Sequence, residues 1–329
     1  MKSVRLTSKK GQESWFFMQI LDATKNIRLN ARNLVVKRLG ADPIIVKYDP
    51  VLRMPVVQYG VRSRIRIGTR INPLHLSLYA CKQLGLEHIT GPILVPRLRE
   101  TETHDYVRRV TAWLISNQKS RGAYDVWEID FPWPPAHVYP PWISALSEAF
   151  GALVLLQTGH RESSRRHLKS MLTDFKDGGT SLYLADGLWF LEYPSANPPL
   201  VLNGMLHCLV ILHDCADRLA DDALRRGFVV AYQTLKRNIG LFDGSFYTYY
   251  DSLKTPADEK YHQIHLSLIR KLYELTNDSY FLPWISRWER YEKWYPLVEP
   301  IIFTRHLLKI RKMLYDSDEI MPKERQAAW

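Results

Sequence analysis

Hydrophobic and polar positions follow a helical rhythm along most of the chain. Four stretches are apolar on nearly every side, as expected for helices buried between neighbours, and each is followed by a more amphipathic, charged stretch. The apolar stretches span residues 72–84, 141–156, 199–212 and 260–275. The amphipathic stretches span residues 103–118, 162–175, 221–238 and 280–294. The apolar stretches open roughly 60–70 residues apart, which indicates a repeated helix pair.

Three of the apolar stretches carry proline at or near the first turn, where its missing N–H costs nothing: Pro73, Pro141 and Pro199. Inner and outer helices that alternate at a fixed period are typical of an α/α toroid. We therefore predict a mainly α protein, an incomplete (α/α) toroid of about four helix pairs. An irregular helical bundle is the alternative interpretation.

Glycine and an aromatic, strand-like stretch follow three of the amphipathic helices, at residues 122–133, 178–194 and 240–250. Gly187 and Gly244 stand where a hairpin would turn. Each stretch leads into the next inner helix, so we expect short β-hairpins on one rim of the toroid. Aromatic and acidic residues at a concave mouth suit a sugar, because aromatic faces stack on pyranose C–H surfaces and carboxylates bind hydroxyls.

The first 70 residues follow a different pattern. Residues 13–40 predict one long helix, and residues 42–68 predict an extended segment. Within it, Arg62, Arg64 and Arg66 alternate, so on one strand all three guanidinium groups would face the same side. Such a row could bind carboxylates or sulfates, and a solvated edge strand that discourages aggregation is the alternative.

These patterns divide the chain into three parts. We expect an N-terminal helix and basic extended segment at 1–70, a toroid catalytic domain at 71–316 and a C-terminal tail at 317–329.

Composition and charge indicate the partner and the compartment. The chain has 45 Lys and Arg against 34 Asp and Glu, a net charge of +11, which favours a polyanionic partner: nucleic acid, anionic lipid or an acidic polysaccharide. Nucleic acid has only this net charge in its favour, without a recognised motif, and we expect no nucleic-acid partner. Cys81, Cys208 and Cys215 form no CxxC pair, which argues against a disulfide framework or zinc site.

The sequence shows no secretory signal and no membrane-spanning apolar stretch, so we expect a cytoplasmic protein. A homodimer is compatible with the sequence.

Several strings, in order along the chain, resemble the D-glucuronyl C5-epimerase family. WFLEYPSANPPLVLNG, at residues 189–204, resembles the family's W-x-E-E-Y-P-x-x-P-x-x-x-V-L-N-G. PPWISALSEA at 140–149, YHQIHL at 261–266, and Arg287-Trp288 with Tyr291 resemble the family's P-G-W-x-S-A-M-A-Q-G, Y-H-T-T-H-I and R-W-x-x-Y. The resemblance covers roughly residues 72–292. It implies conversion of D-glucuronate to L-iduronate within heparosan-like chains, without a cofactor.

Removal of the C5 hydrogen places further negative charge next to a carboxylate, so the reaction needs a group that holds this carboxylate and proton-transfer groups on both ring faces. The resemblance implies catalytic roles for Glu192, Tyr193 and Tyr261, and for Tyr247 by its match to the family's G-x-I-Y-D-L-R-H. We expect Tyr193 or Glu192 and Tyr261 to exchange protons with opposite faces of C5, and Tyr247 to orient the carboxylate.

Further positions are candidates for substrate binding: Arg62, Arg64, Arg66, Tyr79, Trp142, Glu148, Asn203, His262 and His265. Each has an alternative role. The alternatives are a solvated strand for the arginines, core packing for the two aromatic residues, burial with a partner for the glutamate, a structural hydrogen bond for the asparagine, and polarisation of Tyr261 or bonds to helix carbonyls for the histidines. The two histidines have no third ligand at an informative spacing, so we predict no metal site.

The sequence departs from the family pattern after Tyr247. The family's Tyr-Asp-Leu-Arg-His becomes YTYYD at 247–251, so the arginine is missing. Arg62, Arg64, Arg66 or Arg70 could supply the charge instead. The alternative functions are a uronate-specific lyase, a hydrolase with two carboxylates across the scissile bond, and a non-catalytic protein that binds acidic polysaccharide.

Overall fold

The computed structural model describes residues 44–62, 65–93, 95, 105–185, 187–295 and 298. The predicted helix at 13–40, the tail at 317–329 and Arg64 lie outside these residues.

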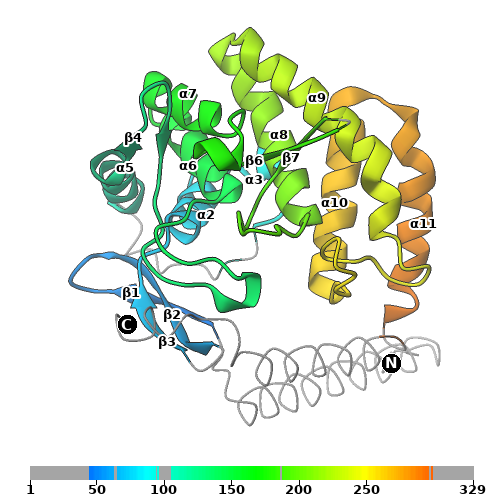
Figure 1. Ribbon diagram of the computed structural model, residues 1–329, viewed down its shortest axis with the longest axis horizontal. Helices are drawn as coiled ribbons and strands as arrows, with labels where there is room; N and C mark the ends of the chain where they lie inside the picture. The colour runs from blue at the N-terminus through cyan, green and yellow to red at the C-terminus, as the bar shows by residue number, and fades with distance from the viewer. Residues whose placement is uncertain are drawn as a thin grey trace, which may run out of the picture.

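The described chain is mainly helical, and its long helices are arranged in pairs (Figure 1). The inner helices are α2 (Pro73–Gln83), α6 (Ala145–Gln157), α8 (Leu202–Leu219) and α10 (Glu259–Thr276). The outer helices are α5 (Tyr106–Asn117), α7 (Arg161–Ser170), α9 (Asp222–Asn238) and α11 (Leu282–Glu292). Each inner helix packs against the next inner helix and against the outer helix that follows it. The predicted helix pairs are thereby confirmed, and their closure into a toroid stays a prediction.

Shorter helical segments connect these elements. They are α3 (Glu87–Thr90) and the 3-10 turns η1 (Pro134–Ala136), η2 (Phe175–Asp177), η3 (Ile239–Phe242) and η4 (Ser279–Phe281). Helix α3 packs against α8.

Local sequence explains where several helices begin. Asn72 caps α2 by accepting a hydrogen bond from the backbone N–H of Leu74, and Pro73 follows at the first helical position. Asp258 caps α10 by accepting from the N–H of Tyr261. The apolar inner helices share one continuous core, in which Cys208 and Cys215 are buried as free thiols.

Two inner helices begin later than the sequence pattern predicts. Helix α6 begins at Ala145 because Trp142, three residues earlier, exchanges backbone hydrogen bonds with Ile129. Helix α8 begins at Leu202 because Val201 forms a bridge with Asp251. The predicted starts at 141 and 199 are therefore wrong, since long-range backbone pairing competes with the helix at these positions.

One of the three predicted hairpins forms within its predicted stretch, where β6 (Ser181–Leu184) pairs with β7 (Gly187–Phe190). Another hairpin joins β4 (Lys119–Ser120) to β5 (Asp125–Val126), so it begins before the stretch 122–133 in which it was expected. The third, expected at 240–250, is wrong: η3 occupies its start, and only an isolated bridge between Asp243 and Thr248 follows.

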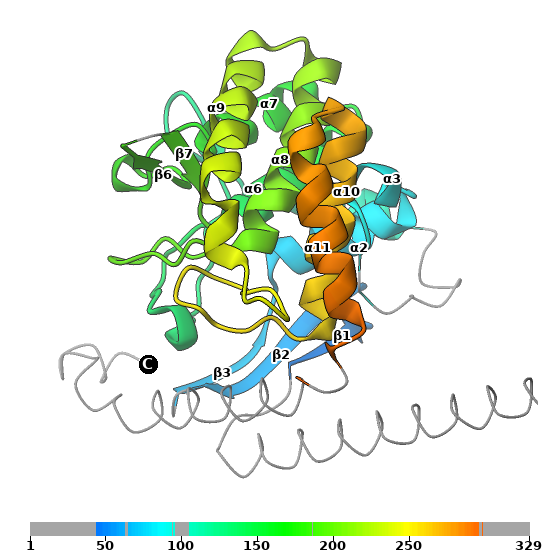
Figure 2. The same cartoon turned by 90° about the vertical axis from the view of Figure 1, so that its right-hand side faces the viewer.

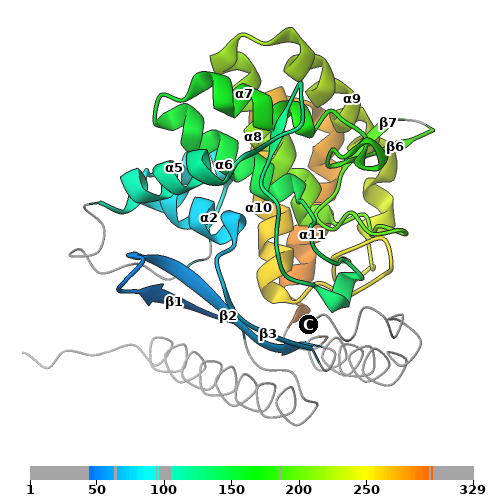
Figure 3. The same cartoon turned by 60° about the vertical axis from the view of Figure 1, so that its left-hand side comes forward.

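A three-stranded antiparallel sheet precedes the helices and lies below their ends in all three views (Figures 2 and 3). Its strands are β1 (Ile45–Asp49), β2 (Met54–Arg62) and β3 (Ile65–Arg70), in the order β1-β2-β3. Strand β2 packs against α2.

The expected single strand with Arg62, Arg64 and Arg66 on one side is wrong. Arg62 ends β2 and pairs with Ile65, the first residue of β3, so the chain reverses within the arginine repeat. Pairing of the two strands satisfies backbone groups that one extended strand would leave open, and it buries Val57 and Ile67.

None of the helices in the described ranges is long and apolar enough to cross a membrane.

Candidate functional site

A cavity of about 520 Å³ lies at the N-terminal ends of the four inner helices. Each of these helices contributes residues from its first turns or its cap: Asn72 and His75 from α2, Ser144 and Ser147 from α6, Asn203 and His207 from α8, and Lys260 and Tyr261 from α10. The segment after β7 contributes Glu192 and Tyr193, and the N-terminal sheet contributes Val46 and Tyr59. The N-terminal end of a helix carries partial positive charge, so this convergence favours a negatively charged ligand.

Glu192 is the only carboxylate among the described residues that line the cavity, and it is 8% exposed. Burial raises the pKa of Glu192 to about 7, and hydrogen bonds from Tyr193 and Tyr250 oppose this rise. A carboxyl group with this pKa exists in both protonation states near neutral pH, as a general acid or base requires. The carboxyl group also leaves little room: a Cβ on Gly204 would lie 3.3 Å from its Oε2.

Tyr250 connects Glu192 to Tyr261. The Tyr250 hydroxyl lies 3.3 Å from both Oε1 and Oε2 of Glu192, and its ring packs edge-on against that of Tyr261 at 4.9 Å between centroids. Burial and the neighbouring Glu192 hold the pKa values of Tyr193 and Tyr250 well above the usual range, so both phenols stay protonated as hydrogen-bond donors. The site thus joins one titratable carboxyl group to three tyrosines.

An aromatic wall extends from this cluster toward the sheet. The ring of Trp142 lies 6.1 Å from that of Tyr193, and Phe131 lies 6.3 Å from Trp142 on its other side. Tyr59 on β2 then contacts Phe131 at 4.7 Å and Trp133 at 5.7 Å between centroids. All five residues line the cavity, which gives it the aromatic surface that a sugar ring stacks against.

Three polar atoms of cavity residues are buried without a hydrogen-bond partner among the described residues. They are His75 Nδ1, Ser147 Oγ and Asn203 Oδ1, one from each of α2, α6 and α8. An unpaired buried polar atom costs about 1–3 kcal/mol, which a ligand with several hydroxyl groups can recover. The cavity is therefore prepared for a polar, hydrogen-bonding ligand.

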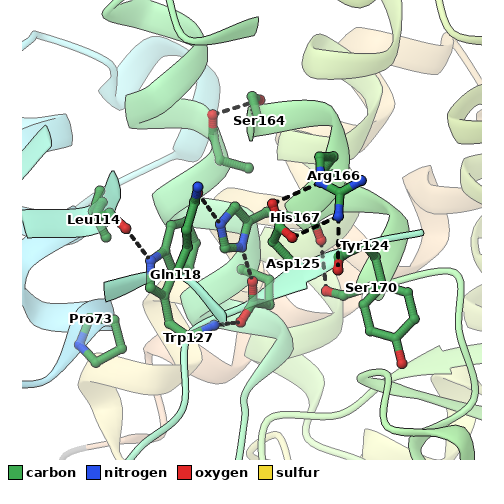
Figure 4. A network of polar contacts seen from close by, with 12 residues as sticks. Pro73, Leu114, Gln118, Tyr124, Asp125, Trp127, Ser164, Arg166, His167 and Ser170 are labelled. Carbon is green, nitrogen blue, oxygen red and sulfur yellow. Dashed lines mark hydrogen bonds and ion pairs between the residues drawn. The ribbon is translucent and has the colours of Figure 1, made fainter. Parts of the chain in front are cut away.

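Glu148 is not among the residues that line this cavity, and it belongs to a buried network with Trp127 and His167. Figure 4 shows these two partners. Oε1 of Glu148 accepts from the Trp127 backbone N–H at 2.9 Å, and its Oε2 lies 2.6 Å from Nδ1 of His167. The imidazole of His167 stacks on the Trp127 indole at 3.4 Å, and the indole N–H donates to the Leu114 carbonyl. Glu148 thus ties α6 to α7 and to β5, the structural alternative that the sequence left open.

His262 and His265 also belong to the core. The Thr248 hydroxyl lies 3.1 Å from Nδ1 of His262 and 3.0 Å from Nδ1 of His265, and Nε2 of His262 donates to the Trp288 carbonyl at 3.0 Å. Burial lowers the pKa of His262 to about 4 and that of His265 well below its usual range, so both are neutral. They hold the loop before α10 against α11. Groups of three or more metal-binding side chains do not occur in the part of the chain that the structure describes.

The remaining candidates lie elsewhere. Tyr79 is 2% exposed and packs against Tyr106 in the core, Tyr247 packs against Tyr249 at 5.5 Å, and Arg66 is exposed on β3. The structure therefore brings together Glu192, Tyr193, Tyr261, Trp142 and Asn203 of the predicted set.

Sequence reasoning missed Tyr250, Lys260, His75 and His207. Tyr250 stands at the position where the family pattern has arginine, which was the available signal for it. His75, Lys260 and His207 lie one to four residues from recognised motif positions on helices that reach the cavity. The direction in which these side chains point depends on tertiary packing, so no local sequence pattern indicates it.

Comparisons with known proteins show the family to which the chain belongs. The family described as the D-glucuronyl C5-epimerase C-terminus matches residues 121–290, just over half of the chain. An uncharacterized protein of Methanocaldococcus jannaschii is 25% identical over 260 residues, which cover 72% of this chain and 82% of that protein. The D-glucuronyl C5-epimerase of Caenorhabditis elegans is 26% identical over 227 residues, which cover 60% of this chain but 36% of that enzyme. The matched residues 121–290 include Glu192, Tyr193, Tyr250 and Tyr261, and the chain belongs to the D-glucuronyl C5-epimerase family, through its C-terminal domain.

Proposed function

We propose that this protein is a polysaccharide C5-epimerase that converts D-glucuronate to L-iduronate within a heparosan-like chain by proton removal and return at C5. The observation that carries the proposal is the meeting of Glu192, Tyr193 and Tyr261 around one cavity, in a chain that belongs to the epimerase family. The aromatic wall and the unpaired polar atoms support a sugar ligand. We interpret the helix pairs as an incomplete (α/α) toroid and expect a cytoplasmic location.

In the proposed mechanism, Glu192 in its ionised form takes the C5 proton. Its pKa of about 7 makes it a better base at neutral pH than Tyr193, whose pKa is well above the usual range. Tyr261 then gives its phenolic proton to the opposite face of C5. After one turnover Glu192 holds one extra proton and Tyr261 lacks one, and proton exchange with solvent restores both groups.

Removal of the C5 proton moves negative charge onto the substrate carboxylate, which must be stabilised. The Tyr193 phenol stays protonated and can donate a hydrogen bond. The N-terminal ends of four helices add partial positive charge at the cavity. These groups are fixed before the substrate binds, so little reorganisation is needed during the reaction.

The alternative of a hydrolase has less support. Hydrolysis of a glycosidic bond normally needs two carboxylates, and Glu192 is the single one among the described cavity residues. Each of the three aromatic stretches carries an aspartate that could act as a second carboxylate: Asp130, Asp186 and Asp243. Asp243 is bound to Arg287 and Tyr291, Asp130 is exposed, and Asp186 lies outside the described residues. A lyase would also remove the C5 proton, so it is distinguished from an epimerase by its unsaturated product.

The test is incubation with heparosan in deuterium oxide, with proton NMR at C5 and ultraviolet absorption measured in parallel. We expect deuterium at C5 without chain cleavage or new absorption. The variant Tyr261→Phe should lose at least about 100-fold of the conversion to L-iduronate, because a phenyl ring cannot donate a proton to the opposite face of C5. Tyr273→Phe on the same helix α10, away from the cavity, is the matched control and should keep its activity.

An unsaturated, absorbing product would instead identify a lyase. If the wild-type protein exchanged no C5 proton in heparosan or another glucuronate polymer, the proposed reaction would be wrong.

A further inference from the structure

We propose that Lys260 binds the carboxylate of the uronate ring and thereby selects a uronate over a neutral sugar. The inference deepens the proposed function and rests on it for the identity of the ligand, although carboxylate binding can be measured without turnover.

The position of Lys260 supports this role. Lys260 lies in the first turn of α10, directly before Tyr261, and lines the same cavity as Glu192. Its Nζ lies 5.7 Å from the centroid of the Tyr261 ring. A carboxylate held by this ammonium group would place the attached C5 beside the tyrosine that we propose as proton donor.

The charge inventory of the cavity leaves few alternatives. Among the described residues that line it, Lys260 and Glu192 alone carry a formal charge at neutral pH. His75 and His207 are neutral, because burial lowers the pKa of each to about 4, and Lys260 contributes to the effect on His75. Among the described residues, the cavity therefore has one cation in its lining, besides one carboxyl group whose charge depends on pH.

Lys260 is also available for a ligand. Lys236 and Lys271 form ion pairs with Asp278 and Glu274, whereas Lys260 forms none with any residue that the structure describes. It is exposed at the cavity wall, so a bound carboxylate would not have to displace an internal partner.

The arginine that the family pattern leads one to expect is replaced here by Tyr250, which donates to Glu192 and adds no charge. Of the arginines first considered as substitutes, Arg66 and Arg70 do not line the cavity: Arg66 is exposed on β3, and Arg70 faces Asp130 at 3.9 Å. Arg64 and the side chain of Arg62 lie outside the described part of the chain. In this proposal, Lys260 in the first turn of α10 supplies the positive charge that the family pattern has in the preceding loop.

The chemistry of Lys260 fits a carboxylate ligand. An ammonium group donates charge-assisted hydrogen bonds, and at the N-terminal end of α10 its charge adds to that of the helix dipole. A hexose with a CH₂OH group in place of the carboxylate would gain little from either. Lys260 is therefore a residue for substrate specificity, and proton transfer remains with Glu192 and Tyr261.

The test compares two probes, a heparosan oligosaccharide and the same oligosaccharide with its carboxyl groups reduced to alcohols, by isothermal titration calorimetry. The wild-type protein should prefer the uronate form. Lys260→Met should weaken binding of the uronate form by about 10- to 100-fold and change binding of the reduced form little. Lys260→Arg should restore part of the preference. Lys271→Met, on the same helix, is the matched control and should behave as wild type.

The inference is wrong if Lys260→Met keeps the preference, if both probes lose affinity equally, or if the wild-type protein does not distinguish them. Deuterium uptake measured on the same samples separates the two proposals. Uptake by the wild type with no effect of Lys260→Met on binding would leave the reaction standing and remove the role of Lys260. If binding depends on Lys260 but no deuterium is taken up, the role of Lys260 in binding stands and the proposed reaction is wrong.

Discussion

Replacement of Glu192 by glutamine should make the protein more stable at alkaline pH while it abolishes activity. In the folded protein, burial raises the pKa of Glu192 from 4.5 to about 7. The folded state therefore binds this proton more tightly than the unfolded state does. As pH rises from about 4.5 to about 7, the folded state must hold an increasingly unfavourable buried charge, and stability falls. Above about 7 the loss is complete.

The magnitude follows from the pKa difference. A difference of about 2.5 units at about 1.4 kcal/mol per unit gives a destabilisation on the order of 3 kcal/mol above pH 7, and essentially none below pH 4.5. Glutamine has nearly the same shape, stays neutral and can still accept a hydrogen bond from Tyr250. Glu192→Gln should therefore be more stable than wild type by up to about 3 kcal/mol at pH 8 and about equally stable at pH 4.5.

Urea denaturation of both proteins at several pH values between 4.5 and 8 measures this difference. Glu274→Gln is the control, because that side chain is 64% exposed and its replacement should leave the pH dependence unchanged. The reasoning would be refuted if Glu192→Gln were less stable than wild type at pH 8, or if the difference did not grow with pH.

Two further replacements test the roles of Tyr250 and Glu148. Tyr250→Phe removes a donor that lowers the pKa of Glu192, so the pH at which deuterium uptake reaches half its maximum should rise by about one unit. An unchanged pH profile would show that Tyr250 does not influence the pKa of Glu192. Glu148→Ala should destabilise the protein by about 3–5 kcal/mol in urea denaturation, since it leaves Trp127 N–H and His167 buried without an acceptor. Substrate affinity of the folded variant should remain, and a selective loss of affinity with normal stability would contradict the structural role.

The helices could be predicted because their causes are local. The apolar runs, Pro73 and the capping residues Asn72 and Asp258 lie within a few residues of the turns that they determine. The starts of α6 and α8 could not be predicted from local sequence, because they depend on backbone partners at Ile129 and Asp251, which are distant in sequence.

The site residues divide in the same way. Glu192, Tyr193 and Tyr261 stand in strings that resemble the family, and the structure brings them together. Tyr247 and Tyr250 lie three residues apart on one loop, and sequence alone could not show which of them turns toward Glu192. The sequence position of Glu148 is compatible with a cavity residue, and its contact with His167 on the next helix shows that it belongs to the core.

The cavity draws its walls from two parts of the chain, and this has a consequence for how its specificity can change. Glu192, Tyr193 and Tyr261 lie within the segment that the family shares, residues 121–290, whereas Tyr59 and His75 precede that segment. The groups proposed to move protons are thus encoded separately from part of the cavity wall. We expect that exchange of the sheet and of α2 between relatives would alter which ligand the cavity accepts and leave these groups in place.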